Sequence, residues 1–358
     1  MKVCVYAIAK DEEKFVDGWF DSMSEADMIC VLDTGSADNT AKRLKQLGAT
    51  VKTQKIDPFR FDVARNLSLK LVPEDADLCV CTDLDERFEK GWRKHLEKAY
   101  TPDAKQYKYR YTWSFLEDGQ EGVVFWSEKI HTRDGFVWTH PVHEVLSYVG
   151  ENKYKATYVP DMQLNHYPDN TKSRKSYLPL LELSVSEDPF DDRNMHYLGR
   201  EYMFAKQYDK AKQTLQKHLA MPNATWADER CASMRYIAKC CIAQNDVDGA
   251  KKWLHNAIAQ APYLREPYID FATLCYNEQN WHGVIFFVNK ALTIKHRSLS
   301  YINEPMSWGA YPYDLLSIAY FYTDDLQNAL LNSKIACTLS KQDRLHQNKL
   351  FFESKAKN

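Results

Sequence analysis

Short apolar runs alternate with amphipathic stretches along the first hundred residues of the chain. Runs without polar alternation are typical of strands buried on both faces, and the stretches between them repeat apolar residues at helical spacing. We therefore predict a largely parallel sheet flanked by helices. The expected strands are 2–9, 28–32, 49–53 and 78–82, and the expected helices are 12–23, 36–47 and 62–71.

The pattern of residue types changes between residues 106 and 167. The runs 106–115 and 122–130 are rich in Tyr, Trp, Val and Thr, which favour strands, and few helical patterns separate them. We interpret this part as the mixed, partly antiparallel half of the same domain.

From about residue 173 onward the pattern is helical and repeats. Ala257 and Ala291 lie 34 residues apart, which is the tetratricopeptide period. Stacked helix pairs bury a continuous core that one pair could not bury, although an irregular bundle is the alternative. The stretch 298–312 has the character of an insertion. Successive repeat units carry a small or β-branched residue at an equivalent position, namely Ala211, Ala250, Val284 and Ala329.

The length of 358 residues suggests two domains, which we place at 1–170 and 175–358. A net charge of −2 argues against a broad nucleic-acid or anionic-membrane footprint. No apolar run approaches the roughly 20 residues that span a bilayer. The apolar run in the opening MKVCVYAIAKDEE is too short for a signal peptide, because charged residues follow it at once. The nine cysteines lack the spacing of zinc ligands. We expect a cytoplasmic protein with reduced thiols.

Two carboxylates follow the apolar strand 78–82 directly, in the segment Thr82-Asp83-Leu84-Asp85-Glu86. Ligands of open α/β sheets bind at the carboxyl ends of strands. Carboxylates two positions apart at such an end can face a hard cation, Mn²⁺ or Mg²⁺, that bridges diphosphate oxygens. Without further context, a solvated acidic turn explains the segment equally well.

The ends of the first two strands carry further polar residues. Asp33 opens the segment 33–40 and can accept hydrogen bonds from a base or a ribose. Gly35 permits a tight turn, and Ser36 or Asp38 can cap the helix that follows. The alternative is a capped strand-to-helix turn without a ligand.

Three segments occur in the order of a known family: MKVCVYAIAKDEEKF with ICVLDTGSADNT, then FRFDVARNLSL, then LCVCTDLDERF. Together they resemble inverting family 2 glycosyltransferases with the GT-A fold, over roughly residues 1–170. The helical part resembles that of bacterial and phage members, including the sublancin-type peptide S-glycosyltransferases. One departure is Asp11, where many members have Asn. The implied fold class is an α/β GT-A (Rossmann-like) domain followed by an all-α tetratricopeptide-like domain.

The resemblance implies roles for residues that contact the donor. Asp33 would contact the base or ribose, and Ala7 and Ala9 would line the base pocket with Asp11 beside it. Arg65 and Asn66 correspond to an Arg-Asn pair near the sugar and diphosphate, where a guanidinium can bind phosphate. A structural salt bridge is the alternative role for Arg65.

The resemblance also implies a metal site. Asp83, with the adjoining Leu84, would face the ribose or the metal, and Asp85 would bind the metal. His166 resembles a histidine that often completes this site, although a core or surface histidine is an equal alternative.

An inverting transfer needs a base that removes the acceptor proton. The segment 135–144 ends in His143-Glu144, a pair similar to that of relatives. We favour Glu144 as the base, with His143 the second choice. Alternatively, both residues orient the acceptor.

These expectations give a metal-dependent transferase whose donor is a nucleotide-sugar, with a UDP-sugar favoured, and whose acceptor could be a protein or peptide. The helical domain could hold the acceptor or form a homodimer. The alternative is an inactive, transferase-like binding module that recruits a protein partner through its repeats. The basic residues Lys172, Arg174 and Lys175 could form a solvated linker or touch the diphosphate.

Overall fold

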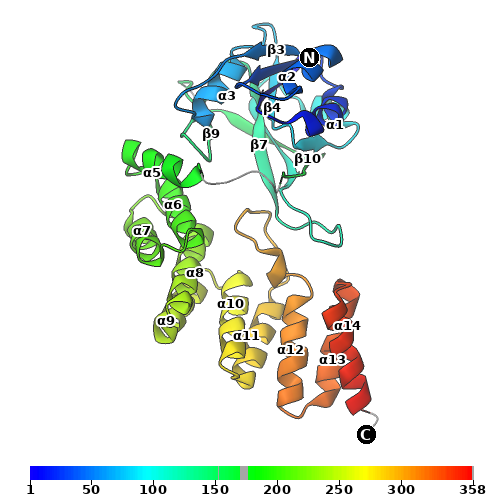
Figure 1. Cartoon of the computed structure of the whole chain (residues 1–358), viewed down its shortest axis with the longest axis vertical. Coiled ribbons are helices and arrows are strands. Elements are labelled where there is room, and N and C mark those ends of the chain that lie inside the picture. Colours follow the sequence, from blue (N-terminus) through cyan, green and yellow to red (C-terminus); the bar gives the residue numbers. More distant parts are fainter. Residues whose placement is uncertain (152, 170–175, 357–358) are drawn as a thin grey trace. The chain divides into compact units, whose positions relative to one another are not determined.

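The computed structural model describes residues 1–151, 153–169 and 176–356 (Figure 1). It divides into two compact units, Met1–Phe115 with Val124–Ser184, and Leu116–Val123 with Val185–Asn358. The division falls inside α5 (Tyr177–Glu187), later than the boundary expected from the sequence, and groups a short segment of the first half with the helices. Lys172, Arg174 and Lys175 lie outside the described residues.

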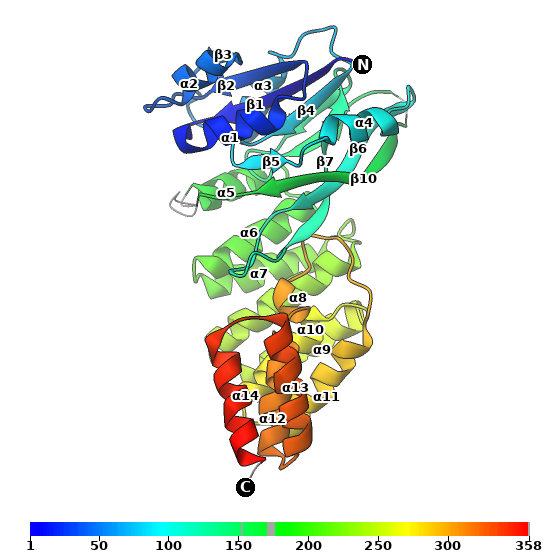
Figure 2. The same cartoon turned by 90° about the vertical axis from the view of Figure 1, so that its right-hand side faces the viewer.

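The N-terminal unit is built on an eight-stranded sheet in the order β3-β2-β1-β4-β7-β6-β10-β5 (Figures 1 and 2). Strands β1 to β4 are mutually parallel, and β7 runs antiparallel to both β4 and β6, as the change in sequence texture predicts. The strands are β1 (Val3–Ala9), β2 (Met28–Asp33), β3 (Thr50–Thr53), β4 (Leu78–Thr82), β5 (Glu86–Phe88), β6 (Ala104–Thr112), β7 (Val124–Thr132), β8 (Phe136–Thr139), β9 (Val145–Tyr148) and β10 (Lys155–His166).

The register brings the carboxyl ends of several strands to one edge of the sheet. Ala9 pairs with Asp33 across β1 and β2, and Thr82 of β4 pairs with Ala7. Strand β10 runs parallel to β6, and two antiparallel steps through β7 give β6 the direction of β4. His166, at the end of β10, therefore lies at the same edge as the segment that follows Thr82.

Helices cover both faces of the sheet around β1, β2 and β4 because these strands are buried almost throughout. One face of β1 packs with Trp19 of α1 (Glu13–Met23) and Trp92 of α4 (Trp92–Ala99). The other packs partly against α3 (Phe61–Leu69). Helix α2 (Thr40–Leu47) begins later than expected. Ser36 lies outside it, whereas Asp38 accepts a hydrogen bond from the Thr40 backbone.

The hairpin of β8 and β9 is fixed by a chain of hydrogen bonds. Trp138 Nε1 donates to the Tyr6 hydroxyl at 2.8 Å, and that hydroxyl lies 2.8 Å from His131 Nε2. His131 Nδ1 contacts the carbonyl of Thr132, so this nitrogen carries the proton and Nε2 accepts from Tyr6. Burial lowers the pKa of His131 to about 4, which keeps the ring neutral.

The second unit consists of helices that pack in consecutive pairs, α6 with α7, α8 with α9, α10 with α11, and α12 with α13, with α14 against the last pair. This confirms the predicted stack of helix pairs. The helices are α6 (Asp192–Phe204), α7 (Tyr208–Ala220), α8 (Ala227–Ala243), α9 (Val247–Gln260), α10 (Glu266–Asn277), α11 (Trp281–Thr293), α12 (Tyr311–Tyr322), α13 (Leu326–Leu339) and α14 (Asp343–Lys355), with a short η1 (Pro305–Ser307) in the expected insertion.

The turns inside the pairs repeat the same backbone geometry. Each pair has a residue with positive φ in its turn, at Lys206, Asn245, Gln279 and Asp324. In the last three pairs the next residue caps the second helix through its side chain, as Asp246 does with the amide of Gly249 at 2.9 Å. The residues Ala211, Ala250, Val284 and Ala329, matched from the sequence, are all fully buried.

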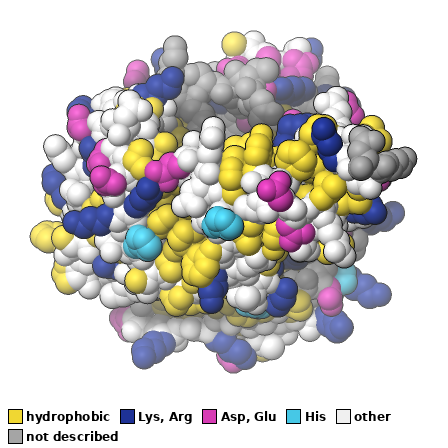
Figure 3. All heavy atoms as spheres, turned by 90° about the horizontal axis from the view of Figure 1, so that it is seen from below, with side chains coloured by type: hydrophobic (Ala, Val, Ile, Leu, Met, Phe, Trp, Pro, Cys, Tyr) yellow, Lys and Arg dark blue, Asp and Glu magenta, His cyan; other side chains and the backbone are white. Residues whose placement is uncertain are grey.

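Apolar side chains remain exposed on the helical unit. Phe286, Tyr322 and Leu350 are more than half exposed, and hydrophobic side chains gather on the face shown in Figure 3. None of the described helices combines the length and apolar character needed to cross a bilayer. All nine cysteines carry free thiols.

Candidate functional site

Arg65 of α3 joins two parts of the predicted site. Its Nη2 donates to Asp83 Oδ1 at 2.7 Å, and its Nε donates to Glu144 Oε1 at 2.8 Å. The guanidinium is 3% exposed and lies 5.4 Å from the ring centre of Trp138. The acidic segment after β4 and the segment before β9, which are far apart in the sequence, therefore meet at one buried arginine.

Lys129 of β7 extends this charge cluster, because the antiparallel pairing of β7 with β4 sets it beside the end of β4. Its Nζ lies 3.2 Å from Asp83 Oδ2 and 3.3 Å from Glu86 Oε1. Tyr111 donates to the same Glu86 oxygen at 2.8 Å, and the Asp83 amide donates to Glu86 Oε2 at 2.9 Å. Both oxygens of Asp83 are thus in contact with cationic side chains.

The pKa shifts follow from this arrangement. Burial disfavours the charge on Lys129, but Glu86 and Asp83 outweigh burial and hold its pKa well above the usual value. Likewise, burial would raise the pKa of Asp83, but Arg65 and Lys129 hold it well below the usual value. Asp83 is therefore ionised at neutral pH.

Asp85 and His166 form the second part of the site. His166 Nε2 lies 3.2 Å from Asp85 Oδ2, and its Nδ1 lies 2.8 Å from the carbonyl oxygen of Trp113. Since a carbonyl only accepts, Nδ1 carries a proton and donates it. A proton or a metal ion must then lie between Nε2 and the carboxylate, because two facing lone pairs repel each other.

The loops after β1 and β2 are joined through Asp33 and Asp11. Asp33 is 1% exposed and accepts from the amide of Ser36 at 3.2 Å. Asp11, with φ of 52°, accepts from the Ala37 amide at 2.7 Å, and its own amide donates to the Ser36 hydroxyl. The Asp11 side chain therefore holds the loop before α2 in place by accepting a hydrogen bond from the backbone of that loop.

Four of the expected contact residues have roles in the structure that differ from the simplest expectation. Ala7 and Leu84 are fully buried in the core, and Ala7 is paired with Val31 of β2 and Thr82 of β4, so neither residue exposes an atom to a ligand in this structure. Asn66 uses its side-chain oxygen and nitrogen to hold the backbone of Trp138, at 2.9 and 2.8 Å. Both carboxylate oxygens of Asp83 are engaged by Arg65 and Lys129, and its contact with the ribose or the metal stays a prediction.

The two candidates for the base differ in their surroundings. Glu144 is bound to Arg65 through Oε1, and this links it to Asp83. His143 has φ of 51° and its ring lies 5.9 Å from that of Tyr177. Glu144 is joined to the charged cluster directly, through its hydrogen bond with Arg65.

Lys129, Glu86 and Tyr111 were not identified from the sequence. Glu86 stood next to the acidic pair, and a charged lysine inside an otherwise β-rich segment was a signal that could have identified Lys129. The pairing of β7 with β4 was needed to bring them together.

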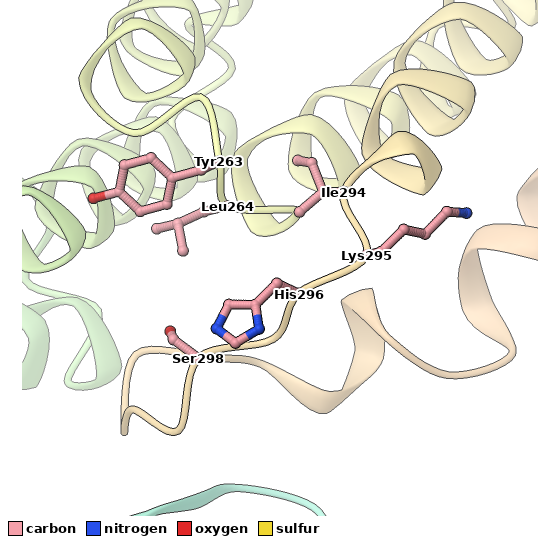
Figure 4. Close-up of a pocket in the computed structure, with 6 residues that line it drawn as sticks. All are labelled: Tyr263, Leu264, Ile294, Lys295, His296 and Ser298. Carbon is pink, nitrogen blue, oxygen red and sulfur yellow. The ribbon is translucent and has the colours of Figure 1, made fainter.

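The helical unit contains a shallow cavity of about 310 Å³. Figure 4 shows Tyr263 and Leu264, before α10, on one side and the segment Ile294–Ser298 on the other, with Lys295 pointing away. Its lining is mainly apolar.

No family model matches the chain, and no curated protein matches it. The chain resembles a solved chain of the APC/C hetero-tetramer Cut9–Hcn1 at 12% identity and a TM-score of 0.41, over 51% of this chain and 33% of that one, so it spans about a third of that protein. It resembles PilF of Pseudomonas aeruginosa at 13% identity and a TM-score of 0.37, over 49% and 72% of the two chains. It also resembles YrrB, a TPR protein with an unusual peptide-binding site, at 13% identity and a TM-score of 0.37. The match covers 50% of this chain and 83% of that one. Tetratricopeptide-repeat proteins are therefore among the solved structures that this chain resembles.

Proposed function

We propose that the N-terminal unit is a glycosyltransferase that moves a sugar from a nucleotide-sugar, with a UDP-sugar favoured, to an acceptor with inversion. The observation that carries this proposal is the convergence of Asp33, the Asp83–Arg65–Glu144 cluster and the Asp85–His166 pair at the carboxyl edge of one sheet. Open α/β sheets bind ligands at this edge. The resemblance of the sequence to family 2 glycosyltransferases supports the same function.

The charge balance of the site favours a donor that brings a divalent cation. The buried cluster holds two cations, Arg65 and Lys129, against three carboxylates, and Asp85 adds another. A diphosphate would be repelled by this excess of negative charge. Asp85 and His166 fit a divalent ion, since an oxygen and an imidazole nitrogen face each other at 3.2 Å. When bound, Mn²⁺ or Mg²⁺ would neutralise the charge that builds on the leaving diphosphate.

The side chains divide the remaining tasks. Asp33, at the end of β2, would accept hydrogen bonds from the base or ribose. Arg65 holds Glu144 through Oε1, and the second oxygen of Glu144 would take the proton of the attacking acceptor group. One-step displacement with such a base inverts the anomeric centre.

The first experiment is a screen of UDP-, GDP- and TDP-sugars for hydrolysis and transfer by mass spectrometry, with and without Mn²⁺. We expect slow, metal-dependent release of nucleoside diphosphate from at least one donor. Binding of nucleotides without turnover of any donor would favour an inactive, transferase-like protein. A thermal shift with UDP separates binding from turnover, because a ligand stabilises only the state that binds it.

Glu144→Gln should reduce transfer about 10²–10⁴-fold, the usual contribution of a general base. It should reduce donor binding little, because an amide can still accept from Arg65 Nε. His143→Gln is the matched control and should cost less than tenfold. Rates of transfer and the dissociation constant of UDP measure the two effects. If His143→Gln has the larger effect on the rate, the roles of the two residues are reversed.

A second candidate function is recruitment of a protein partner by the helical unit. Its stacked helix pairs present an apolar cavity, and Tyr263 at its border is 53% exposed. A partly exposed aromatic side chain beside a cavity is a common anchor for a peptide. The peptide would be either an acceptor for the first unit or a partner alone.

This candidate predicts that Tyr263→Ala weakens binding of a captured peptide at least tenfold, since an anchor contributes about 2 kcal/mol. Peptide-array screening of the full chain, followed by anisotropy titration of each hit, measures the affinity. Phe286→Ala, on the exposed surface of α11, is the control. Equal loss in both variants would place the peptide elsewhere.

A further inference from the structure

The helical unit contains a second cluster of metal-type ligands, unrelated to the sheet. Asp192 lies in the first turn of α6, His218 in the last turn of α7, and Glu229 in the first turn of α8. One ligand atom from each lies within 4.8 Å of the other two, a criterion that, within the described ranges, this group alone meets. The three helices follow one another in the chain and pack together (Figure 1).

The spacing suits a small ion. His218 Nε2 lies 3.3 Å from Glu229 Oε1. Nitrogen and oxygen ligands bound at about 2.0–2.1 Å to a tetrahedral ion lie about 3.3–3.4 Å apart. His218 and Glu229 are 0% and 3% exposed, whereas Asp192 is partly exposed and leaves a path for an ion and a water ligand.

A second layer of hydrogen bonds orients two of the ligands. The Tyr301 hydroxyl donates to Glu229 Oε2 at 2.6 Å, which leaves Oε1 toward His218. The Ser233 hydroxyl lies 2.9 Å from His218 Nδ1, on the side of the ring away from Glu229. Histidines that bind metals usually have their second nitrogen fixed in this way.

The Ser233 hydroxyl lies between two histidine rings, and its single proton limits how they can be protonated. Its oxygen also lies 2.7 Å from Nδ1 of His196, yet a hydroxyl has one proton and can donate to one of the two rings. The other ring must donate its own Nδ1 proton. Burial lowers the pKa of His196 to about 3, so that ring is neutral. When His218 donates from Nδ1 to Ser233, Nε2 is the ring nitrogen that faces the Glu229 carboxylate.

The Nε2 atoms of His218 and His196 are both buried; that of His196 forms no hydrogen bond, and that of His218 faces Glu229 Oε1 at 3.3 Å without hydrogen-bond geometry. A buried polar atom without a hydrogen bond is rare and calls for an unseen partner. Carboxylate oxygens of Asp192 and Glu229 lie within 4.8 Å of each other, and like charges at such a distance repel each other. One proton on His218 would relieve one carboxylate, whereas a divalent ion relieves both and occupies Nε2.

We propose that Asp192, His218 and Glu229 bind a divalent first-row transition metal, with Zn²⁺ as the preferred ion, that links α6, α7 and α8. An imidazole with two carboxylates favours Zn²⁺ over Mg²⁺ or Ca²⁺. The ion ties together the first helices of the helical stack and does not depend on sugar transfer by the other unit.

The test uses the full chain, stripped with EDTA and titrated with Zn²⁺. Native mass spectrometry counts bound ions, and thermal unfolding measures stabilisation. Asp192→Asn keeps the shape of a partly exposed side chain and removes a ligand charge. We expect it to fold, to unfold at the same or a higher temperature without metal, and to bind Zn²⁺ at this site about 100-fold more weakly, since even outer partners of metal ligands change affinity by 10–100-fold.

The control separates this site from the one proposed in the sheet unit. Asp85→Asn should keep the Zn²⁺ that Asp192→Asn loses, and His218→Gln should lose it as well. If His218→Gln fails to fold, Asp192→Asn still decides. Equal Zn²⁺ affinity and equal stabilisation in wild type and Asp192→Asn would overturn the proposal, and so would the absence of any bound Zn²⁺ in the wild type.

Discussion

Asp85→Asn should lower sugar transfer and donor hydrolysis by about 10²–10⁴-fold while the fold stays intact. A metal ion that stabilises the leaving diphosphate contributes several kcal/mol to the transition state, and each 1.4 kcal/mol or so is tenfold in rate. Asparagine keeps the size of the side chain but removes the charge that faces His166 at 3.2 Å. The side chain is partly exposed, so little stability is at stake.

Rates should be measured across a Mn²⁺ titration, because loss of a ligand raises the metal concentration needed for half-maximal activity. Asp17→Asn is a suitable control, since Asp17 is exposed and pairs with Arg43 on the surface. Wild-type activity and wild-type metal dependence in Asp85→Asn would remove the metal role and with it the main support for the proposed mechanism.

Arg65→Met should destabilise the N-terminal unit by about 3–5 kcal/mol, which is the usual cost of removing one partner from a buried ion pair. The substitution keeps much of the apolar stem but leaves Asp83 and Glu144 without the guanidinium that holds both. Since Arg65 is 3% exposed, water cannot readily replace it. We expect loss of activity as well, because Glu144 would no longer be positioned.

The matched control is Arg43→Met, because Arg43 and Asp17 form a solvent-exposed pair, and such pairs contribute little to stability. Urea unfolding combined with hydrogen-exchange mass spectrometry reports on the N-terminal unit separately. Adding Asp83→Asn to Arg65→Met should restore part of the stability, since coupled charges are not additive. Similar losses for Arg65→Met and Arg43→Met would mean that the cluster is well hydrated.

The first half of the sheet could be predicted because β1, β2 and β4 are apolar without interruption, so their burial does not depend on distant partners. The helical repeat was visible for a similar reason. Each helix pair buries a small residue against its neighbour, and Ala250 and Val284 keep their spacing because that contact is local.

The site was predictable only at strand ends. Asp33 and Asp85 follow apolar strands, so the sequence places them at an edge that binds ligands. The alternative role weighed for Arg65, a structural salt bridge, describes what it does in the structure, and the same contact also holds the candidate base.

By itself, the sequence determined which segments are strands and helices, the repeat, and the acidic residues at the strand ends, because these depend on neighbours within a few residues. Tertiary structure alone decided that Lys129 meets Asp83, that His166 faces Asp85, and that Asp192, His218 and Glu229 converge. These contacts depend on strand order and helix packing. Contacts between residues far apart in the chain produce no local periodicity in the sequence, so the sequence pattern does not predict them.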